Sequence, residues 1–187
     1  MTVNHCFVFA YGSNLDRVQM RERCPSAVLV DAATLPRVRL VFAGMSMRWG
    51  NGGIAGIELS PRKGRGQLHG AVYRISFHDR LRLDAFEGHP TSYERVSAHP
   101  TLASGYTMQA DVYMLRRGLT TPRRPSPEYL ARIKGGYREL GLPLSALHDA
   151  LSRCQKEQDQ RLASMTDPAY EGEKEEAPPC RSRSWAH

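Results

Sequence analysis

The sequence predicts an α+β protein whose small mixed or barrel-like sheet is flanked by helices. Most apolar stretches are short, rich in β-branched and aromatic residues, and bounded by glycine or proline, which is typical of strands. Helical patterns are fewer, and they do not alternate with the strands in the regular rhythm of a parallel α/β sheet. Several antiparallel strands with few helices therefore favour the α+β class.

The strands are expected at residues 7–11, 27–30, 37–42, 54–59, 68–75, 93–98 and 106–115, and the helices at 15–23, 77–86, 127–140 and 144–162. Ser76 and Ser126 precede two of these helices, where a serine hydroxyl accepts a hydrogen bond from a free backbone N–H. Residues 43–50 are expected to be irregular. The side chains expected to face inward are Leu15, Val18 and Met20 in the first helix and Phe77, Leu81 and Ala85 in the second.

The 187 residues are expected to form one domain over 1–162, followed by a disordered polar tail over 163–187. No apolar run approaches the roughly 18 residues of a membrane helix, so no membrane partner is expected. The four cysteines are scattered, which favours reduced thiols in the cytoplasm. The net charge of +7 raises the alternative of nucleic-acid binding, but no basic motif is interleaved with aromatic residues, and we expect no nucleic-acid partner.

A strand, a tight polar loop and a helix start follow one another over residues 7–15. Gly12 accepts backbone angles that other residues avoid, and Ser13 and Asn14 hydrogen-bond nearby backbone and can cap the following helix. A loop of this kind directs several N–H groups outward, which suits an anion such as a carboxylate. The alternative is an ordinary turn between a strand and a helix.

Glu87 is the residue whose position best suits acid/base chemistry. It follows Phe86 at the expected end of a helix, where an apolar neighbour and the helix dipole both disfavour the ionised carboxylate. A carboxyl group with a raised pKa suits proton transfer near neutral pH. The alternative is a solvent-exposed acid at a helix end. Glu94 and Glu58 are weaker candidates, and Asp84 is expected on the exposed face of the helix.

Other catalytic signatures are missing from the sequence. No serine or cysteine lies in a nucleophile-elbow pattern, the seven histidines show no metal-ligand spacing, and there is no phosphate-binding or dinucleotide loop. We therefore expect no metal and no cofactor. Carboxylate chemistry beside a backbone anion site fits a reaction in which the substrate supplies its own nucleophile.

The chain resembles the γ-glutamylcyclotransferase family over roughly residues 7–151. The matching stretches, in chain order, are Tyr-Gly-Ser-Asn-Leu at 11–15, Gly-Gly-Ile-Ala at 52–55, His-Gly-Ala-Val-Tyr at 69–73, Leu-Asp-Ala-Phe-Glu-Gly at 83–88 followed by Tyr93, Pro-Ser-Pro-Glu-Tyr at 125–129 and Gly-Leu-Pro-Leu at 141–144. The resemblance implies a small mixed β-barrel with flanking helices and release of 5-oxoproline from a γ-glutamyl compound.

By matching position, the resemblance implies that Glu87 is the general acid and base. The substrate-binding positions that it implies are Tyr11, Gly12, Ser13, Asn14, Leu15, Tyr93 and Tyr129, of which the loop backbone would hold the glutamyl α-carboxylate and the tyrosines would hydrogen-bond the substrate. The substrate α-amine would attack its own γ-carbonyl. The expected partner is thus a small γ-glutamyl molecule, and a homodimer is kept open as the assembly.

Three alternatives remain at this point. The leaving group is undefined, so the substrate is a γ-glutamyl amino acid, a γ-glutamyl amine or a biosynthetic intermediate carrying a γ-glutamyl protecting group. The second alternative is a member of the same fold that binds a ligand or partner without catalysis. The third is nucleic-acid binding, whose mark would be strong salt dependence.

Overall fold

The computed structural model describes residues 4–60 and 66–165. Its strands are β1 (His5–Ala10), β2 (Val28–Pro36), β3 (Val38–Ser46), β4 (Gly52–Leu59), β5 (Gln67–Ser76), β6 (Tyr93–Ala98), β7 (Thr101–Leu102) and β8 (Ala110–Leu115). Its helices are α1 (Arg17–Arg23), α2 (Phe77–Glu87), α3 (Pro127–Glu139) and α4 (Leu144–Met165), with short 3-10 turns η1 (Ser13–Leu15), η2 (Met47–Trp49) and η3 (Arg117–Leu119).

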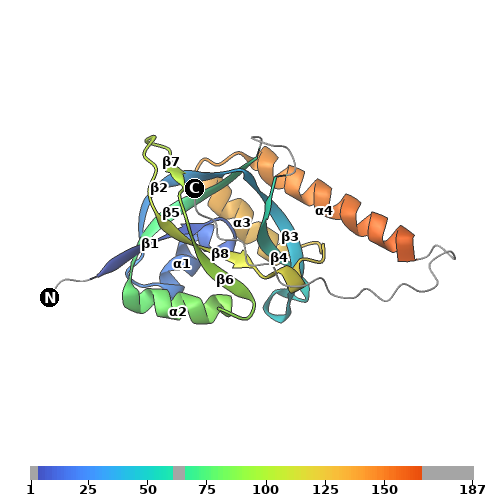
Figure 1. The fold of residues 1–187 in the computed structure, drawn as a ribbon, viewed down its shortest axis with the longest axis horizontal. Coiled ribbons are helices and arrows are strands. Elements are labelled where there is room, and N and C mark those ends of the chain that lie inside the picture. Colours follow the sequence, from blue (N-terminus) through green and yellow to red (C-terminus); the bar gives the residue numbers. More distant parts are fainter. Residues whose placement is uncertain (1–3, 61–65, 166–187) are drawn as a thin grey trace, which may run out of the picture.

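Strand β1 lies inside a six-stranded mixed sheet whose order is β6-β8-β1-β5-β2-β7 (Figure 1). It pairs antiparallel with β5, with Val8 opposite Tyr73, and parallel with β8, with Val8 opposite Asp111. The consecutive residues Val8 and Phe9 are both almost fully buried, as expected for a central strand covered on its two faces. The loop that follows β1 therefore starts from a rigid position.

Strands β3 and β4 form a separate two-stranded antiparallel sheet, with η2 at the tip that joins them. Arg37, whose φ is 66°, turns the chain from β2 into β3. The predicted α+β class with mixed strands and flanking helices is confirmed. In the described residues the strand pairing forms these two sheets without a continuous closed ring.

The two long C-terminal helices pack on the sheets, and α4 extends beyond them at one side of the molecule (Figure 1). On α4, Cys154 and Arg153 reach the carbonyl oxygens of Phe42 and Leu40 on β3, at 3.4 and 2.9 Å. Both predicted serine caps are present, because Ser76 accepts from Asp79 N–H and Ser126 accepts from Tyr129 N–H. Within the described ranges, no helix combines the length and the apolar character needed to cross a bilayer.

The inward face of α2 was predicted wrongly, and that of the first helix was predicted only in part, since Leu15 and Met20 are fully buried as expected. Val18 is 68% exposed and Leu81 is 64% exposed, whereas Leu83 is fully buried. In α1 the inward positions are held by Gln19, Met20 and Arg23, so polar side chains occupy part of the face that apolar periodicity assigns to Val18. A helix of two or three turns has too few residues for apolar periodicity alone to fix its buried face.

Several element boundaries also differ from the prediction. Strand β3 continues to Ser46 and leads into η2, although residues 43–50 were expected to be irregular. Strand β8 begins at Ala110, and the two-residue strand β7 was not predicted. Helix α4 ends at Met165 rather than near residue 162. The predicted tail from residue 166 onward and the basic stretch within 61–65 lie outside the described residues.

Candidate active site

The loop after β1 brings Ser13 and Asn14 to the start of a 3-10 turn. The N–H groups at the beginning of such a turn have no partner within it, which leaves them available to an anion. Gly12 lies so close to its neighbours that a Cβ atom there would stand 3.1 Å from the Ala55 Cβ and 3.3 Å from the Tyr129 hydroxyl. The cap of α1 is Asp16, whose carboxylate accepts from two N–H groups, so Ser13 and Asn14 do not cap this helix as expected.

Glu87 is the last residue of α2, and its carboxylate turns toward this loop. Its Oε1 accepts hydrogen bonds from Asn14 Nδ2 at 2.8 Å and from Arg23 Nη1 at 3.0 Å. The same Arg23 Nη1 also donates to Asn14 Oδ1 at 2.9 Å, so one guanidinium nitrogen bridges both residues. Gly88, with a φ of 64°, ends the helix immediately afterwards and sets the direction of the chain beyond Glu87.

Burial raises the pKa of Glu87 above its ordinary value, and the side chain is only 14% exposed. The Arg23 charge and the Asn14 hydrogen bond act in the opposite direction and offset part of this rise. The predicted direction of the shift is therefore present, but its cause is burial rather than contact with Phe86, which is itself 44% exposed. A carboxyl group in this environment can exchange a proton at a pH above the usual range of glutamate.

Three tyrosines close the pocket, and each already has a backbone partner. The Tyr93 hydroxyl donates to Ala55 O at 2.6 Å, and the Tyr129 hydroxyl accepts from Ala55 N–H at 3.1 Å. The Tyr11 hydroxyl donates to the carbonyl oxygen of Tyr113. Tyr11 and Tyr93 thus use their hydroxyl hydrogens within the protein, whereas the contact to Ala55 N–H leaves the Tyr129 hydrogen for another acceptor.

Burial keeps all three phenols neutral. It raises the pKa of Tyr129 to about 12 and the pKa values of Tyr11 and Tyr93 well above the ordinary value of tyrosine. The nearby Glu87 charge contributes to each of these rises, because two negative charges in one pocket repel.

The structure brings seven of the eight predicted site residues to one pocket: Tyr11, Gly12, Ser13, Asn14, Glu87, Tyr93 and Tyr129. The eighth, Leu15, is fully buried, and its atoms face Gly136 on α3 rather than the pocket. The weaker candidates are elsewhere, since Glu58 pairs with Arg39 and Glu94 is exposed on β6. Asp84 is not on an exposed face as expected, because its side chain is only 15% exposed and accepts from Arg95 and from the Tyr113 hydroxyl.

Sequence reasoning missed Arg23 and Gln19, which hold the polar side of the pocket. Gln19 Nε2 donates to Ser13 Oγ at 2.8 Å, and both Gln19 and Arg23 are buried. Their spacing offered a signal, because Gln19 and Arg23 are four residues apart and share one face of α1. Polar residues on an inward face mark a position with a buried partner.

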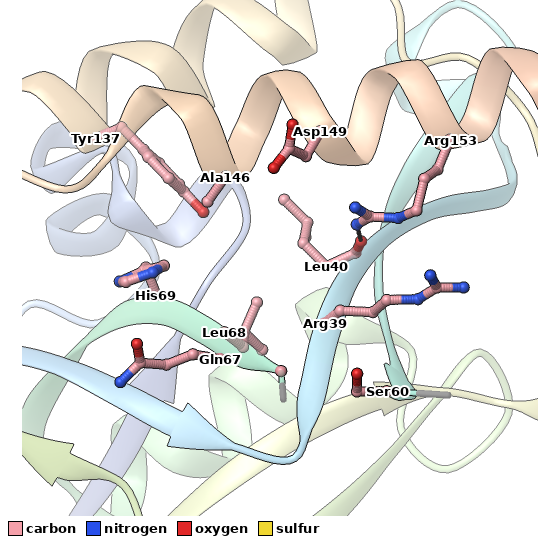
Figure 2. A pocket seen from close by; sticks show the side chains of 11 residues that line it. Arg39, Leu40, Ser60, Gln67, Leu68, His69, Tyr137, Ala146, Asp149 and Arg153 are labelled. Carbon is pink, nitrogen blue, oxygen red and sulfur yellow. Dashed lines mark hydrogen bonds between the residues drawn. The ribbon is translucent and has the colours of Figure 1, made fainter. Parts of the chain in front are cut away.

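A larger cavity, of about 520 Å³, lies elsewhere, between α4 and strands β3 and β5 (Figure 2). It contains none of the predicted site residues. Its two arginines already have partners, since Arg39 pairs with Glu58 and Arg153 donates to Leu40 O. Glu87 and the loop, rather than the cavity with the larger volume, therefore define the candidate active site.

Among the residues that the structure describes, no cluster of three or more His, Cys, Asp or Glu side chains could hold a metal ion. Cys6, Cys24 and Cys154 are free thiols, and burial raises the pKa of each. Cys180 lies outside the described residues.

Comparison with known proteins decides the family. Residues 8–136 match the family model described as "Gamma-glutamyl cyclotransferase, AIG2-like". The chain belongs to this γ-glutamyl cyclotransferase family. The mouse γ-glutamylcyclotransferase is 34% identical over 140 residues, covering 72% of this chain and 71% of the mouse protein. The human γ-glutamylcyclotransferase is 31% identical over 140 residues, covering 73% and 72% of the two chains.

A solved structure agrees with this assignment. A protein described as "Gamma-glutamyl cyclotransferase" superposes with a TM-score of 0.67 at 28% identity, covering 92% of this chain and 95% of that one. The family resemblance predicted from the short motifs is thus confirmed, and so is the fold of the γ-glutamyl cyclotransferase family.

Proposed function

We propose that this member of the γ-glutamyl cyclotransferase family releases 5-oxoproline from a γ-glutamyl compound, with Glu87 as general acid and base. The observation that carries the proposal is a buried carboxylate with a raised pKa beside a loop whose free N–H groups suit a substrate carboxylate. The curated relatives with the same activity support it. A cytoplasmic location, expected from the scattered cysteines, is part of this proposal.

The reaction moves two protons from the α-nitrogen to the departing nitrogen. Glu87 removes the first proton from the α-ammonium group of the glutamyl moiety, and the freed amine attacks the γ-carbonyl carbon. A C–N bond forms and closes the five-membered ring. Glu87 then gives its proton to the departing nitrogen, and the original C–N bond breaks. Glu87 takes the second proton from the ring nitrogen and passes it to the released amine, so the products are a neutral lactam and an ammonium group. Ring closure is intramolecular, so holding the glutamyl chain in a folded shape supplies much of the acceleration.

We propose different tasks for the two oxygens of Glu87. Both hydrogen bonds described above, from Asn14 and Arg23, end on Oε1. Oε2 receives neither, so it is the oxygen proposed to carry the proton. The Ser13 and Asn14 N–H groups are proposed to bind the glutamyl α-carboxylate, and the Tyr129 hydroxyl is proposed to donate to a substrate oxygen.

Substitution of Glu87 by glutamine tests this mechanism. Glutamine retains a carbonyl oxygen that can accept from both Asn14 and Arg23, but it cannot take a proton at neutral pH. We expect 5-oxoproline release from γ-glutamyl-alanine to fall by about 10²–10⁴-fold, measured as kcat by chromatography of the product.

The matched control is Glu94→Gln, which makes the same chemical change at an exposed position on β6. It is expected to keep the wild-type rate. Full activity of Glu87→Gln would refute the role of Glu87, and absence of product from the wild-type protein with every γ-glutamyl amino acid and amine tested would refute the activity.

A further inference from the structure

Arg48 lies in η2, at the tip between β3 and β4, and its guanidinium rests against two aromatic rings. Its Cζ atom is 5.8 Å from the centre of the Phe86 ring and 6.0 Å from the centre of the Trp49 ring. Phe86 directly precedes Glu87, and the Trp49 ring is 5.0 Å from the Tyr129 ring that closes the pocket. The two rings therefore hold this cation on the side of the candidate active site where Glu87 and Tyr129 lie.

No carboxylate of the described residues forms an ion pair with Arg48. No hydrogen bond or ion pair joins its guanidinium to another residue that the structure describes, and the side chain is exposed. Its neighbours differ in this respect, since Arg23 is paired with Glu87 and Arg132, which also lies over Trp49, is 3.2 Å from Asp16. Arg48 is thus a positioned cation with its hydrogen-bond donors free.

The leaving side of a γ-glutamyl amino acid carries a negative charge close to the bond that breaks. Its α-carboxylate is attached to the carbon next to the departing nitrogen, and this nitrogen must lie within hydrogen-bond reach of Glu87. A cation that meets this carboxylate must therefore lie near Glu87. The positive charge of Arg48 also offsets a small part of the rise that burial causes in the pKa of Glu87, less than Arg23 and the Asn14 hydrogen bond do, consistent with such a position.

We propose that Arg48 binds the α-carboxylate of the departing amino acid, an inference that rests on the proposed function. This contact makes the protein select γ-glutamyl amino acids over γ-glutamyl amines. A guanidinium can form a bidentate, charge-assisted pair with a carboxylate, and the Phe86 and Trp49 rings limit the orientations of the side chain. An amine that lacks the carboxylate gains nothing from this contact. Arg48 is accordingly a specificity-determining residue.

A pair of substrates that differ only in this carboxylate tests the proposal. γ-Glutamyl-alanine and γ-glutamyl-ethylamide have the same carbon skeleton around the scissile bond, apart from the carboxylate. We expect Arg48→Gln to lower kcat/KM for γ-glutamyl-alanine about tenfold and to change it less than about twofold for the ethylamide. Arg48→Lys should retain part of the preference, and Arg138→Gln, which removes an exposed arginine on α3, should leave both values unchanged.

A binding measurement separates this inference from the activity itself. In the Glu87→Gln background, calorimetry should show that Arg48→Gln weakens binding of γ-glutamyl-alanine about tenfold and leaves binding of the ethylamide unchanged. If the wild-type protein released no 5-oxoproline but this difference were present, the proposed function would fail and the role of Arg48 would stand. An equal loss for both compounds, or no binding of either, would overturn the role of Arg48.

Discussion

At the scale of single residues, the bridge from Arg23 to Asn14 and Glu87 is the feature on which the proposed chemistry depends. The Arg23 and Glu87 side chains are only 6% and 14% exposed, so their charges are poorly screened by water. Removing one partner of such a buried pair leaves the other charge unpaired, which is costly. Arg23 therefore controls both the orientation and the proton affinity of Glu87.

Arg23→Gln should move the acidic limb of the pH–rate profile to higher pH. The Arg23 charge lowers the pKa of Glu87, so its loss raises this pKa further. A general base works only when ionised, and the pH at which kcat/KM begins to rise must therefore increase. Arg21→Gln removes a charge from the exposed side of the same helix and should leave the limb unchanged. An unaltered limb in Arg23→Gln would argue against Glu87 as the titrating base.

Glu87→Gln should gain stability relative to the wild type as the pH rises. The folded-state pKa of Glu87 is raised, so the wild-type fold loses stability as pH rises from below the unfolded-state pKa through the folded-state pKa. Glutamine does not ionise and suffers no such loss, although the variant leaves the buried Arg23 charge unpaired at every pH. The Tm of the variant minus the Tm of the wild type should therefore be larger at pH 8 than at pH 4. A difference that grows toward acidic pH would contradict the raised pKa.

Glu87 could be chosen from the sequence and Arg23 could not, because sequence reasoning uses the residues that lie nearby along the chain. Glu87 stands at a helix end next to an aromatic residue, a local feature that the sequence displays. Arg23 acquires its role from a partner 64 positions away, and no local pattern reveals that contact. Local reasoning finds residues whose environment is made by their neighbours in sequence, and it misses those whose environment is made by the fold.

At the scale of elements, helix α3 fixes the position of the loop after β1. Tyr129 at its start contacts Ala55, and Gly136 near its end lies directly against Leu15. A Cβ atom at Gly136 would stand 2.5 Å from the Leu15 Cβ and 2.7 Å from the Leu15 carbonyl carbon. The helix and the loop are therefore packed too closely for any larger residue.

Two neighbouring glycines of α3 should respond oppositely to alanine. Gly136→Ala should destabilise the protein by about 1–3 kcal/mol, because the new methyl group collides with the backbone of the loop. Gly135→Ala should stabilise it by about 0.5–1 kcal/mol, because alanine favours the helix and nothing lies within 4 Å of its added Cβ. Urea unfolding of both variants measures the difference. If both substitutions changed the free energy of unfolding in the same direction, the close contact described between Gly136 and Leu15 would be contradicted.

The elements that were predicted well are those with long apolar patterns or strong end signals. Helix α3 begins after Ser126 with Pro127 at its first position, and β5 and β6 match their predicted ranges within a residue or two. The short strand β7 depends on pairing with the distant strand β2, and the extension of β3 to Ser46 depends on its hairpin pairing with β4, where Ser46 lies opposite Gly52. Such pairing is decided by tertiary contacts, which β-propensity reflects only weakly.

At the scale of the whole molecule, ligand binding should appear as increased stability. A ligand that binds only the folded state and is present at about one hundred times its Kd adds about 2.7 kcal/mol. We expect γ-glutamyl-alanine to raise the Tm of Glu87→Gln, in which turnover is blocked. A free amino acid such as alanine, which lacks the glutamyl group, should have a much smaller effect. No shift with γ-glutamyl-alanine at millimolar concentration would weaken the proposed site.

The net charge of +7 permits a contrasting test with nucleic acid. A protein that binds DNA or RNA through its phosphates loses affinity steeply as salt increases. We expect this chain to show no binding to duplex DNA or single-stranded RNA at about 150 mM salt in a fluorescence anisotropy titration. Tight, strongly salt-dependent binding would instead support the nucleic-acid alternative.

Proton transfer and selection of the departing amine are proposed to use different parts of the chain, because η2 lies at the tip of the β3–β4 hairpin. The proposed proton-transfer group Glu87 and its partners come from α2, α1 and the loop after β1, whereas Arg48 comes from the hairpin tip. On the proposed roles, a gene library at Met45, Met47 and Arg48 would vary which amine departs, while it spares the buried Trp49 against Tyr129 and leaves Glu87 and its hydrogen-bond partners unchanged. Directed evolution of new γ-glutamyl substrates could therefore begin at this tip.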